Sequence, residues 1–208
     1  MEGLDGTDMM QRIVFATGNA GKMKEIKEIM EDLECEVLSM KDLGIDVDIS
    51  ENGSTYEENA LEKARTVAPY VKQGDIVMAD DSGLEIDYLN QEPGIYSARY
   101  LGENTSYHIK NNNLLERLNG VTDDKRSARF ICAIAAIFPD GKEITTRGVI
   151  EGKIAYKECG KGGFGYDPIF YVPELGKTTA QLTDEEKNVV SHRGNALRTM
   201  KEKLKEIL

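Results

Sequence analysis

Two adjacent carboxylates, a hydroxyl and a glycine stand near the middle of the chain. The apolar run 76–79 leads directly into Asp80, Asp81, Ser82 and Gly83 and predicts a short buried strand. Ligands of open α/β sheets bind beyond the carboxyl ends of strands, so these side chains are candidates for a catalytic site. Because successive strand side chains point to opposite faces, we expect only one carboxylate to face a ligand. The alternative is an ordinary polar turn.

A glycine-containing loop near the N-terminus is a candidate phosphate site. It follows the apolar run 13–16 and precedes an amphipathic pattern that starts at Met23. Free backbone N–H groups and the helix dipole attract anions at such a helix start, and Lys22 adds a full positive charge. The loop is not a Walker A motif, because only two residues separate its glycines and Met23 replaces the Ser or Thr that binds magnesium. A plain strand-to-helix turn is the alternative. The candidate residues are Thr17, Gly18, Asn19, Ala20, Gly21 and Lys22.

A second glycine-rich loop, residues 160–168, formally contains G-x-G-x-x-G. A dinucleotide fingerprint must open a helix, whereas Pro168 disfavours helix at Asp167 and an apolar strand pattern follows. We therefore reject the dinucleotide interpretation. The loop presents Phe164, whose ring can stack on a base, and Asp167, whose carboxylate can accept base N–H groups. The alternative is a loop whose aromatic residues pack on the core.

Two further groups of polar residues are ambiguous by themselves. Glu51 lies in an acidic loop just before a predicted helix, where it either projects into a cleft or is simply solvated. Ser191, His192 and Arg193 cluster at a predicted helix junction. No nucleophile elbow lies near them, so a catalytic Ser/His pair is not expected.

Elements that position these residues are predicted from periodicity and turn signals. The strand pattern at 130–138, the turn at 139–141 and the returning strand at 143–150 indicate an antiparallel pair. A separate strand is expected at 84–88. Helices are expected at 105–118, in a segment that starts with overlapping capping boxes at Ser54 and Thr55, and at the C-terminus. The fold class is therefore α/β, with a long mixed β-sheet flanked by helices. We expect residues 1–11 to form a disordered extension and residues 12–208 a single domain.

Composition narrows the ligand classes. The net charge of −11 disfavours nucleic-acid binding. Two histidines do not supply a His-rich zinc site, and a bound metal is expected to be a hard cation such as Mg²⁺ held by carboxylates. No apolar run is long enough for a membrane span, and the first ten residues do not resemble a signal peptide. Three widely spaced cysteines indicate free thiols and a cytoplasmic location.

Taken in order, the motifs are more specific than any one of them. The set T-G-N-A-G-K, E-N-G, D-D-S-G, P-G-I-Y-S-A-R-Y, G-G-F-G-Y-D-P and E-K-N-V-V-S-H-R resembles the inosine/xanthosine triphosphate pyrophosphatase family, from about residue 13 to about residue 204. The resemblance implies two lobes around a central nucleotide-binding cleft and a homodimer. It also implies Mg²⁺-dependent hydrolysis of ITP, dITP or XTP to the monophosphate and pyrophosphate.

The resemblance also implies residue roles. Asp81 matches the catalytic acid, and Glu51 and Asp81 match metal-associated acids. The loop 17–22 and Ser82 match triphosphate-binding positions. The nucleoside-binding positions are matched by Phe164, Gly165, Tyr166, Asp167, Lys187, His192 and Arg193.

Chemistry consistent with these roles leaves some alternatives open. Donors on Lys187, His192 and Arg193 suit the 6-oxygen of hypoxanthine and xanthine and leave the amino group of adenine unmatched. Guanine also carries this oxygen, so Asp167 and the pocket shape are expected to act at the 2-position. A non-catalytic nucleotide sensor and a pyrophosphatase for other nucleotides are the competing hypotheses.

Overall fold

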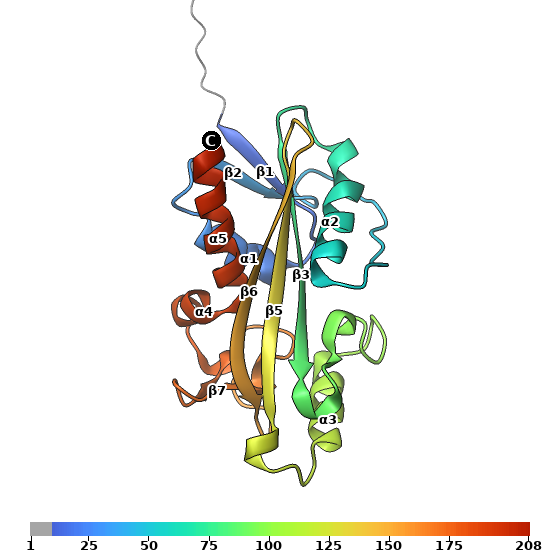
Figure 1. Cartoon of the computed structure of the whole chain (residues 1–208), viewed down its shortest axis with the longest axis vertical. Coiled ribbons are helices and arrows are strands. Elements are labelled where there is room, and N and C mark those ends of the chain that lie inside the picture. Colours follow the sequence, from blue (N-terminus) through green and yellow to red (C-terminus); the bar gives the residue numbers. More distant parts are fainter. Residues whose placement is uncertain (1–9) are drawn as a thin grey trace, which may run out of the picture.

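The computed structural model describes residues 10–208 and has a long central sheet with helices on both faces (Figure 1). The helices are α1 (Ala20–Ile29), α2 (Tyr56–Val67), α3 (Tyr107–Arg117), α4 (Asp184–Val190) and α5 (His192–Ile207). The strands are β1 (Gln11–Phe15), β2 (Cys35–Ser39), β3 (Ile76–Ile86), β4 (Glu92–Pro93), β5 (Ser127–Ile137), β6 (Glu143–Ile154), β7 (Phe170–Val172) and β8 (Lys177–Thr178).

The sheet is mixed, as the sequence predicted. Its order is β2-β1-β3-β5-β6-β7-β8, and β4 pairs with β3 at one end. β1 runs parallel to β2 and β3, whereas β3, β5, β6, β7 and β8 pair antiparallel. The three long strands β3, β5 and β6 form the spine of the molecule (Figure 1).

Alternating side chains of β5 divide the core between the two faces of the sheet. Cys132 and Ile134 pack with α1 and α5 on one face. Ile131 and Ala133 pack with Tyr56 at the start of α2 on the other face. This period of two follows from strand geometry. A separate cluster, built on Leu84, Phe130, Phe170 and neighbouring residues, forms the core at the other end of the long strands.

The stretch 80–83 is not a turn. We predicted a strand that ends at residue 79 and a second one at 84–88, but β3 runs without a break from Ile76 to Ile86, and Asp87 and Tyr88 belong to a 3₁₀ turn. Its partner β5 accounts for the difference, since the antiparallel register is continuous from Val77 opposite Ile137 to Ile86 opposite Ala128. Burial of the two carboxylates is compensated by cations from three helices, as described below.

Helix boundaries follow their capping residues. Thr183 and Glu186 form the predicted reciprocal capping box of α4. Thr55 caps α2, but the carboxylate of Glu58 accepts the N–H of Ser54, so the predicted reciprocal box is absent there. α2 ends at Val67, before a short 3₁₀ turn that contains Pro69.

The predicted N-terminal extension falls mainly on residues 1–9, which lie outside the described residues. Gln11 belongs to β1, so at this residue the predicted extension 1–11 is wrong. Within residues 10–208, no helix is long and apolar enough to cross a bilayer.

Candidate active site

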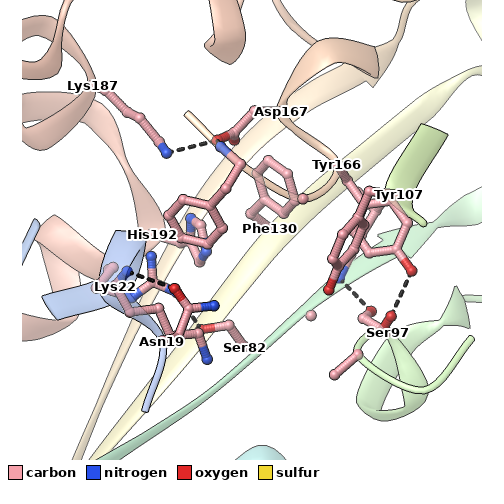
Figure 2. Close-up of a pocket in the computed structure, with 16 residues that line it drawn as sticks. Asn19, Lys22, Ser82, Ser97, Tyr107, Phe130, Tyr166, Asp167, Lys187 and His192 are labelled. Carbon is pink, nitrogen blue, oxygen red and sulfur yellow. Dashed lines mark hydrogen bonds and ion pairs between the residues drawn. The ribbon is translucent and has the colours of Figure 1, made fainter. Parts of the chain in front are cut away.

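A pocket opens on the α1 and α5 side of β3. It is lined by residues of the first loop, of β3 and β5, of the 94–100 loop, of the second glycine-rich loop and of the α4–α5 junction. Figure 2 shows Asn19 and Lys22 at one side, Lys187 and Asp167 at another, and Tyr107, Tyr166 and Ser97 across from them. The lining residues are Asn19, Lys22, Ser82, Gly83, Leu84, Ser97, Ala98, Tyr107, Phe130, Phe164, Gly165, Tyr166, Asp167, Lys187, His192 and Arg193.

Hydrogen bonds fix the conformation of the first glycine-containing loop, residues 17–22, at the N-terminus of α1. Asn19 caps the helix by accepting the N–H of Lys22 at 3.0 Å, and its own N–H donates to Thr17 Oγ1 at 3.1 Å. A Cβ on Gly21 would lie 2.9 Å from a ring carbon of Phe164, so a glycine is needed for the two loops to meet. The helix N-terminus and Lys22 together form an anion-binding end of the pocket.

Asp80 is the buried anion beneath this end. Its Oδ2 lies 3.2 Å from Lys22 Nζ and 3.3 Å from Arg193 Nη2, and it also accepts from Ser82 Oγ at 3.1 Å. Burial opposes the charge of Asp80, but Lys22, Arg193 and Lys63 outweigh it and hold its pKa well below the usual range. Asp80 is therefore a permanent negative charge that orients these cations.

Asp81 projects from the opposite face of β3, toward α2. Its Oδ1 is 3.3 Å from Lys63 Nζ, and its Oδ2 accepts from Asn59 Nδ2 at 3.3 Å. Lys63 Nζ also lies 2.6 Å from Glu51 Oε1, so the oxygens of the two acids converge on one cation position. Burial and the charges of Glu51 and Asp80 raise the pKa of Asp81, and Lys63 offsets part of this. A carboxylate with a raised pKa is a better proton acceptor.

Glu25 of α1 connects the first loop to the residues predicted to read the base. One carboxylate oxygen lies 2.5 Å from Lys187 Nζ and the other 2.6 Å from Arg193 Nη1. Lys187 Nζ also lies 2.6 Å from Asp167 Oδ2. Asp167 in turn accepts from the Phe164 N–H and from Thr179 Oγ1. These buried charges satisfy one another, so their main geometric effect is to fix the second glycine-rich loop.

Aromatic rings form much of the apolar part of the pocket, and Phe130 and Phe164 are two of them. The imidazole of His192 stacks on Phe130, with 4.7 Å between ring centroids. Burial and the charges of Arg193 and Lys187 keep the pKa of His192 well below its usual value, so the imidazole is neutral. Phe164 is covered by Lys187, whose Nζ is 4.6 Å from the ring centroid. A planar base fits such a mixture of rings and polar edges.

The structure divides the predicted residues between two places. Asn19, Lys22, Ser82 and every predicted nucleoside-binding residue line the pocket, with Thr17, Gly18, Ala20 and Gly21 in the same loop. Asp81 and Glu51 lie together on the α2 face instead.

Several residues were missed by the sequence reasoning. Glu25 is one helical turn after Lys22, and that spacing was a usable signal. Lys63 lay among apolar positions of a predicted helix, where a charged residue was a signal for burial with partners. Ser97 lay in the motif P-G-I-Y-S-A-R-Y but was given no role there. The others, which carried no signal, are Asn59, Tyr107 and Phe130.

Comparison with known proteins identifies the family. A model described as the Ham1 family matches residues 13–203. The dITP/XTP pyrophosphatase of Clostridium perfringens is 50% identical over 203 residues, which cover 96% of this chain and all of that protein. The dITP/XTP pyrophosphatase of Caldanaerobacter subterraneus is 51% identical over 193 residues, covering 93% and 96% of the two chains.

Solved structures give the same result. The Staphylococcus aureus Ham1 protein superposes with a TM-score of 0.83 at 44% identity, covering 95% of this chain and all of that one. A HAM1 protein from Coxiella burnetii gives a TM-score of 0.83 at 43% identity, with the same coverage. The ordered motifs, the mixed sheet and these relatives lead to one conclusion: the chain belongs to the Ham1 family.

Proposed function

We propose that the chain hydrolyses non-standard purine nucleoside triphosphates, ITP, dITP and XTP, to the monophosphate and pyrophosphate. The observation that carries this proposal is the pocket itself. It joins a phosphate-type loop at Lys22 to a base-sized wall at Phe164 and His192. Asp81, a carboxylate of raised pKa, lies on the opposite face of the same strand, β3. The names of the relatives, dITP/XTP pyrophosphatase, agree with it.

The substrate is proposed to lie with its base toward Phe164 and its phosphates toward the first loop. Loop N–H groups, Lys22 and Ser82 then contact phosphate oxygens. This placement puts the α–β phosphoanhydride bond near β3. Local cations are required, because the protein's net charge of −11 otherwise repels a triphosphate.

Mg²⁺ is the proposed cofactor. Oxygens of Glu51 and Asp81 already surround a single cation, the Lys63 ammonium, and two carboxylates leave room for waters and phosphate oxygens, as Mg²⁺ prefers. Within residues 10–208 no group of three or more His, Cys, Asp or Glu side chains is arranged to hold a metal ion. When bound, the ion would polarise a phosphate oxygen and stabilise charge on the pyrophosphate.

Asp81 is proposed to accept the proton of the attacking water. The water oxygen forms a bond to the α-phosphorus, the bond from that phosphorus to the bridging oxygen breaks, and pyrophosphate leaves. Lys63 keeps Asp81 oriented and keeps part of its population ionised. Asn59 fixes the second carboxylate oxygen.

Base selection is proposed to depend on the α4–α5 junction. Most N–H groups of Lys187 and Arg193 are already paired with the carboxylates of Glu25, Asp167 and Asp80. The few N–H groups that remain are therefore fixed in direction. N–H groups fixed in direction can donate to the 6-oxygen of a purine and leave an amino group at that position unpaired. Contact of Asp167 with the 2-position remains a prediction, since its carboxylate already holds protein donors.

A homodimer and a cytoplasmic location remain predictions from the resemblance and from composition. The exposed rings of Tyr88 and Tyr96 are available for a subunit contact. Light scattering on the purified protein tests the dimer.

Product analysis with ITP and Mg²⁺ tests the proposed function, with ATP and GTP run in parallel. IMP and pyrophosphate from ITP, with little product from ATP or GTP, are expected. IDP and phosphate as products would show that the β–γ bond is cleaved in place of the α–β bond. Binding of ITP without turnover at any Mg²⁺ concentration would favour a nucleotide sensor.

A further inference from the structure

A second cavity lies beside Glu51. Ala98 of the 94–100 loop lines both this cavity and the nucleotide pocket, so the two cavities meet at this loop. The second cavity has an arginine, Arg99, in its wall. Its lining residues are Ile49, Ser50, Glu51, Asn52, Ala98, Arg99 and Glu103.

Arg99 differs from the other arginines in residues 10–208 because its guanidinium lacks both a carboxylate partner and a full set of carbonyl acceptors. It makes one long contact, from Nη2 to the Glu51 carbonyl at 3.4 Å, and lies 5.4 Å from the ring centroid of Tyr96. Its Nε is buried and has no partner. The arginines paired with carboxylates are Arg12, Arg65, Arg117, Arg129, Arg147 and Arg193. Those satisfied by backbone carbonyls are Arg126 and Arg198.

The neighbouring acid does not neutralise this arginine. The carboxylate of Glu51 is turned to Lys63, at 2.6 Å, and only its backbone oxygen meets Arg99. A buried N–H donor without an acceptor costs free energy, and an oxygen of a bound ligand can remove that cost. A guanidinium fork matches the two oxygens of a phosphate group.

We propose that Arg99 binds the terminal phosphates of the substrate and stabilises charge on the departing pyrophosphate. The inference rests on the proposed placement of the nucleotide, with its base at Phe164 and its scissile bond near Asp81. In this proposal the phosphates nearest the ribose lie at the first loop, and the triphosphate continues across β3 and past Ala98 toward Glu51, where Arg99 meets its far end. Donors aimed at a leaving group act on the transition state as well as on binding.

Product inhibition separates the two ends of the substrate. We expect Arg99→Met to weaken inhibition of ITP hydrolysis by inorganic pyrophosphate about tenfold or more, the effect of losing a charged hydrogen bond, and to leave inhibition by IMP within about twofold. The turnover number with ITP falls as well. Arg99→Lys keeps the charge without the fork and gives an intermediate loss.

Arg117→Met is the matched control. Arg117 supports the same loop from its other side, by donating to the Tyr100 hydroxyl at 2.9 Å, and lines neither cavity. If Arg99 only supports the loop, Arg99→Met and Arg117→Met should each weaken inhibition by pyrophosphate and inhibition by IMP to the same extent. That result would show that the inference is wrong. Unchanged pyrophosphate inhibition in Arg99→Met and Arg99→Lys also overturns it. Absence of ITP turnover by the unmodified protein would instead refute the proposed function.

Discussion

Asp80 and Asp81 are consecutive in β3, yet their carboxylates lie on opposite faces of the sheet. Asp80 is 3.2 Å from Lys22 and 3.3 Å from Arg193, whereas Asp81 is 3.3 Å from Lys63. Lys63 Nζ also donates to the Asp80 carbonyl at 3.1 Å, so one lysine holds the strand at this point. The surroundings shift the two pKa values in opposite directions, down for Asp80 and up for Asp81. One acid therefore keeps its charge and the other is suited to take up a proton.

Asp81→Asn is expected to reduce turnover of ITP by about a thousandfold or more, because the proton acceptor is lost. The free energy of unfolding at neutral pH should stay the same or rise, since a raised pKa means that the charge of Asp81 is unfavourable in the fold. Steady-state kinetics and urea denaturation measure the two effects.

The neighbouring substitution, Asp80→Asn, is the control. It leaves Lys22 and Arg193 without their buried partner and should lower the free energy of unfolding by about 3–5 kcal/mol. Near wild-type turnover in Asp81→Asn would remove Asp81 from the reaction. Equal destabilisation by the two substitutions would contradict the assignment of the two carboxylates to different roles.

Activity should fall in acid as Asp81 takes up its proton. Lys63 lowers the pKa of Asp81, so Lys63→Gln removes that help and should move the acid limb of kcat/KM to higher pH. The measurement is the pH profile with ITP. Lys72→Gln, an exposed lysine beyond the end of α2, should leave the limb in place. An unmoved limb in Lys63→Gln, or a shift toward acid, would contradict the role given to Lys63.

Strand and turn patterns in the sequence predicted the mixed sheet, whereas most of the pocket lining was implied by the resemblance to a known family. Strand and turn residues mark the ends of β5 and β6, and capping residues mark α4. The continuity of β3 was missed, since Asp-Asp-Ser-Gly is ordinary turn chemistry and only pairing with β5 keeps it extended.

The pairing of buried charges in the site could not be predicted from the sequence. Glu25, Lys63 and Asn59 lie on helices, and their partners are far away in the chain. Helical position indicates that such a residue is buried, but it does not say which opposite charge meets it. The pKa shifts of Asp80, Asp81 and His192 depend on these partners and were therefore not predictable either.

Glu25→Gln tests the link between α1 and the α4–α5 junction. The substitution keeps the size of the side chain but removes the charge shared by Lys187 and Arg193, so the free energy of unfolding should fall by about 2–4 kcal/mol. Selectivity for ITP over ATP should fall too, because donors released from Glu25 are no longer fixed in direction. Urea denaturation and the ratio of kcat/KM values measure the two changes.

Glu28→Gln gives a matched comparison, because Glu28 is an exposed residue of the same helix. Within residues 10–208, its side chain accepts a hydrogen bond from Asn188 alone. Little change in stability is expected there. A Glu25→Gln protein with full stability and an unchanged ITP/ATP ratio would show that the shared carboxylate has neither effect.

His192 should make the fold sensitive to mild acid. In the unfolded chain its imidazole takes up a proton near pH 6.5, but in the fold burial and the charges of Arg193 and Lys187 keep it neutral to much lower pH. The unfolded state thus binds more protons below pH 6.5. Each further pH unit should lower the free energy of unfolding by up to about 1.4 kcal/mol through this group.

The comparison with His192→Gln isolates this contribution. Asp81 acts in the opposite sense, since its raised pKa lets the fold take up a proton that the unfolded chain lacks, but it does so in both proteins. Glutamine does not titrate, so the difference in unfolding free energy between wild type and His192→Gln should shrink as pH falls from 7 to 5. Loss of the Phe130 stack lowers the variant's stability at every pH without changing that trend. Parallel pH dependences of the two proteins would mean that His192 is protonated in the fold and that its burial does not control its charge.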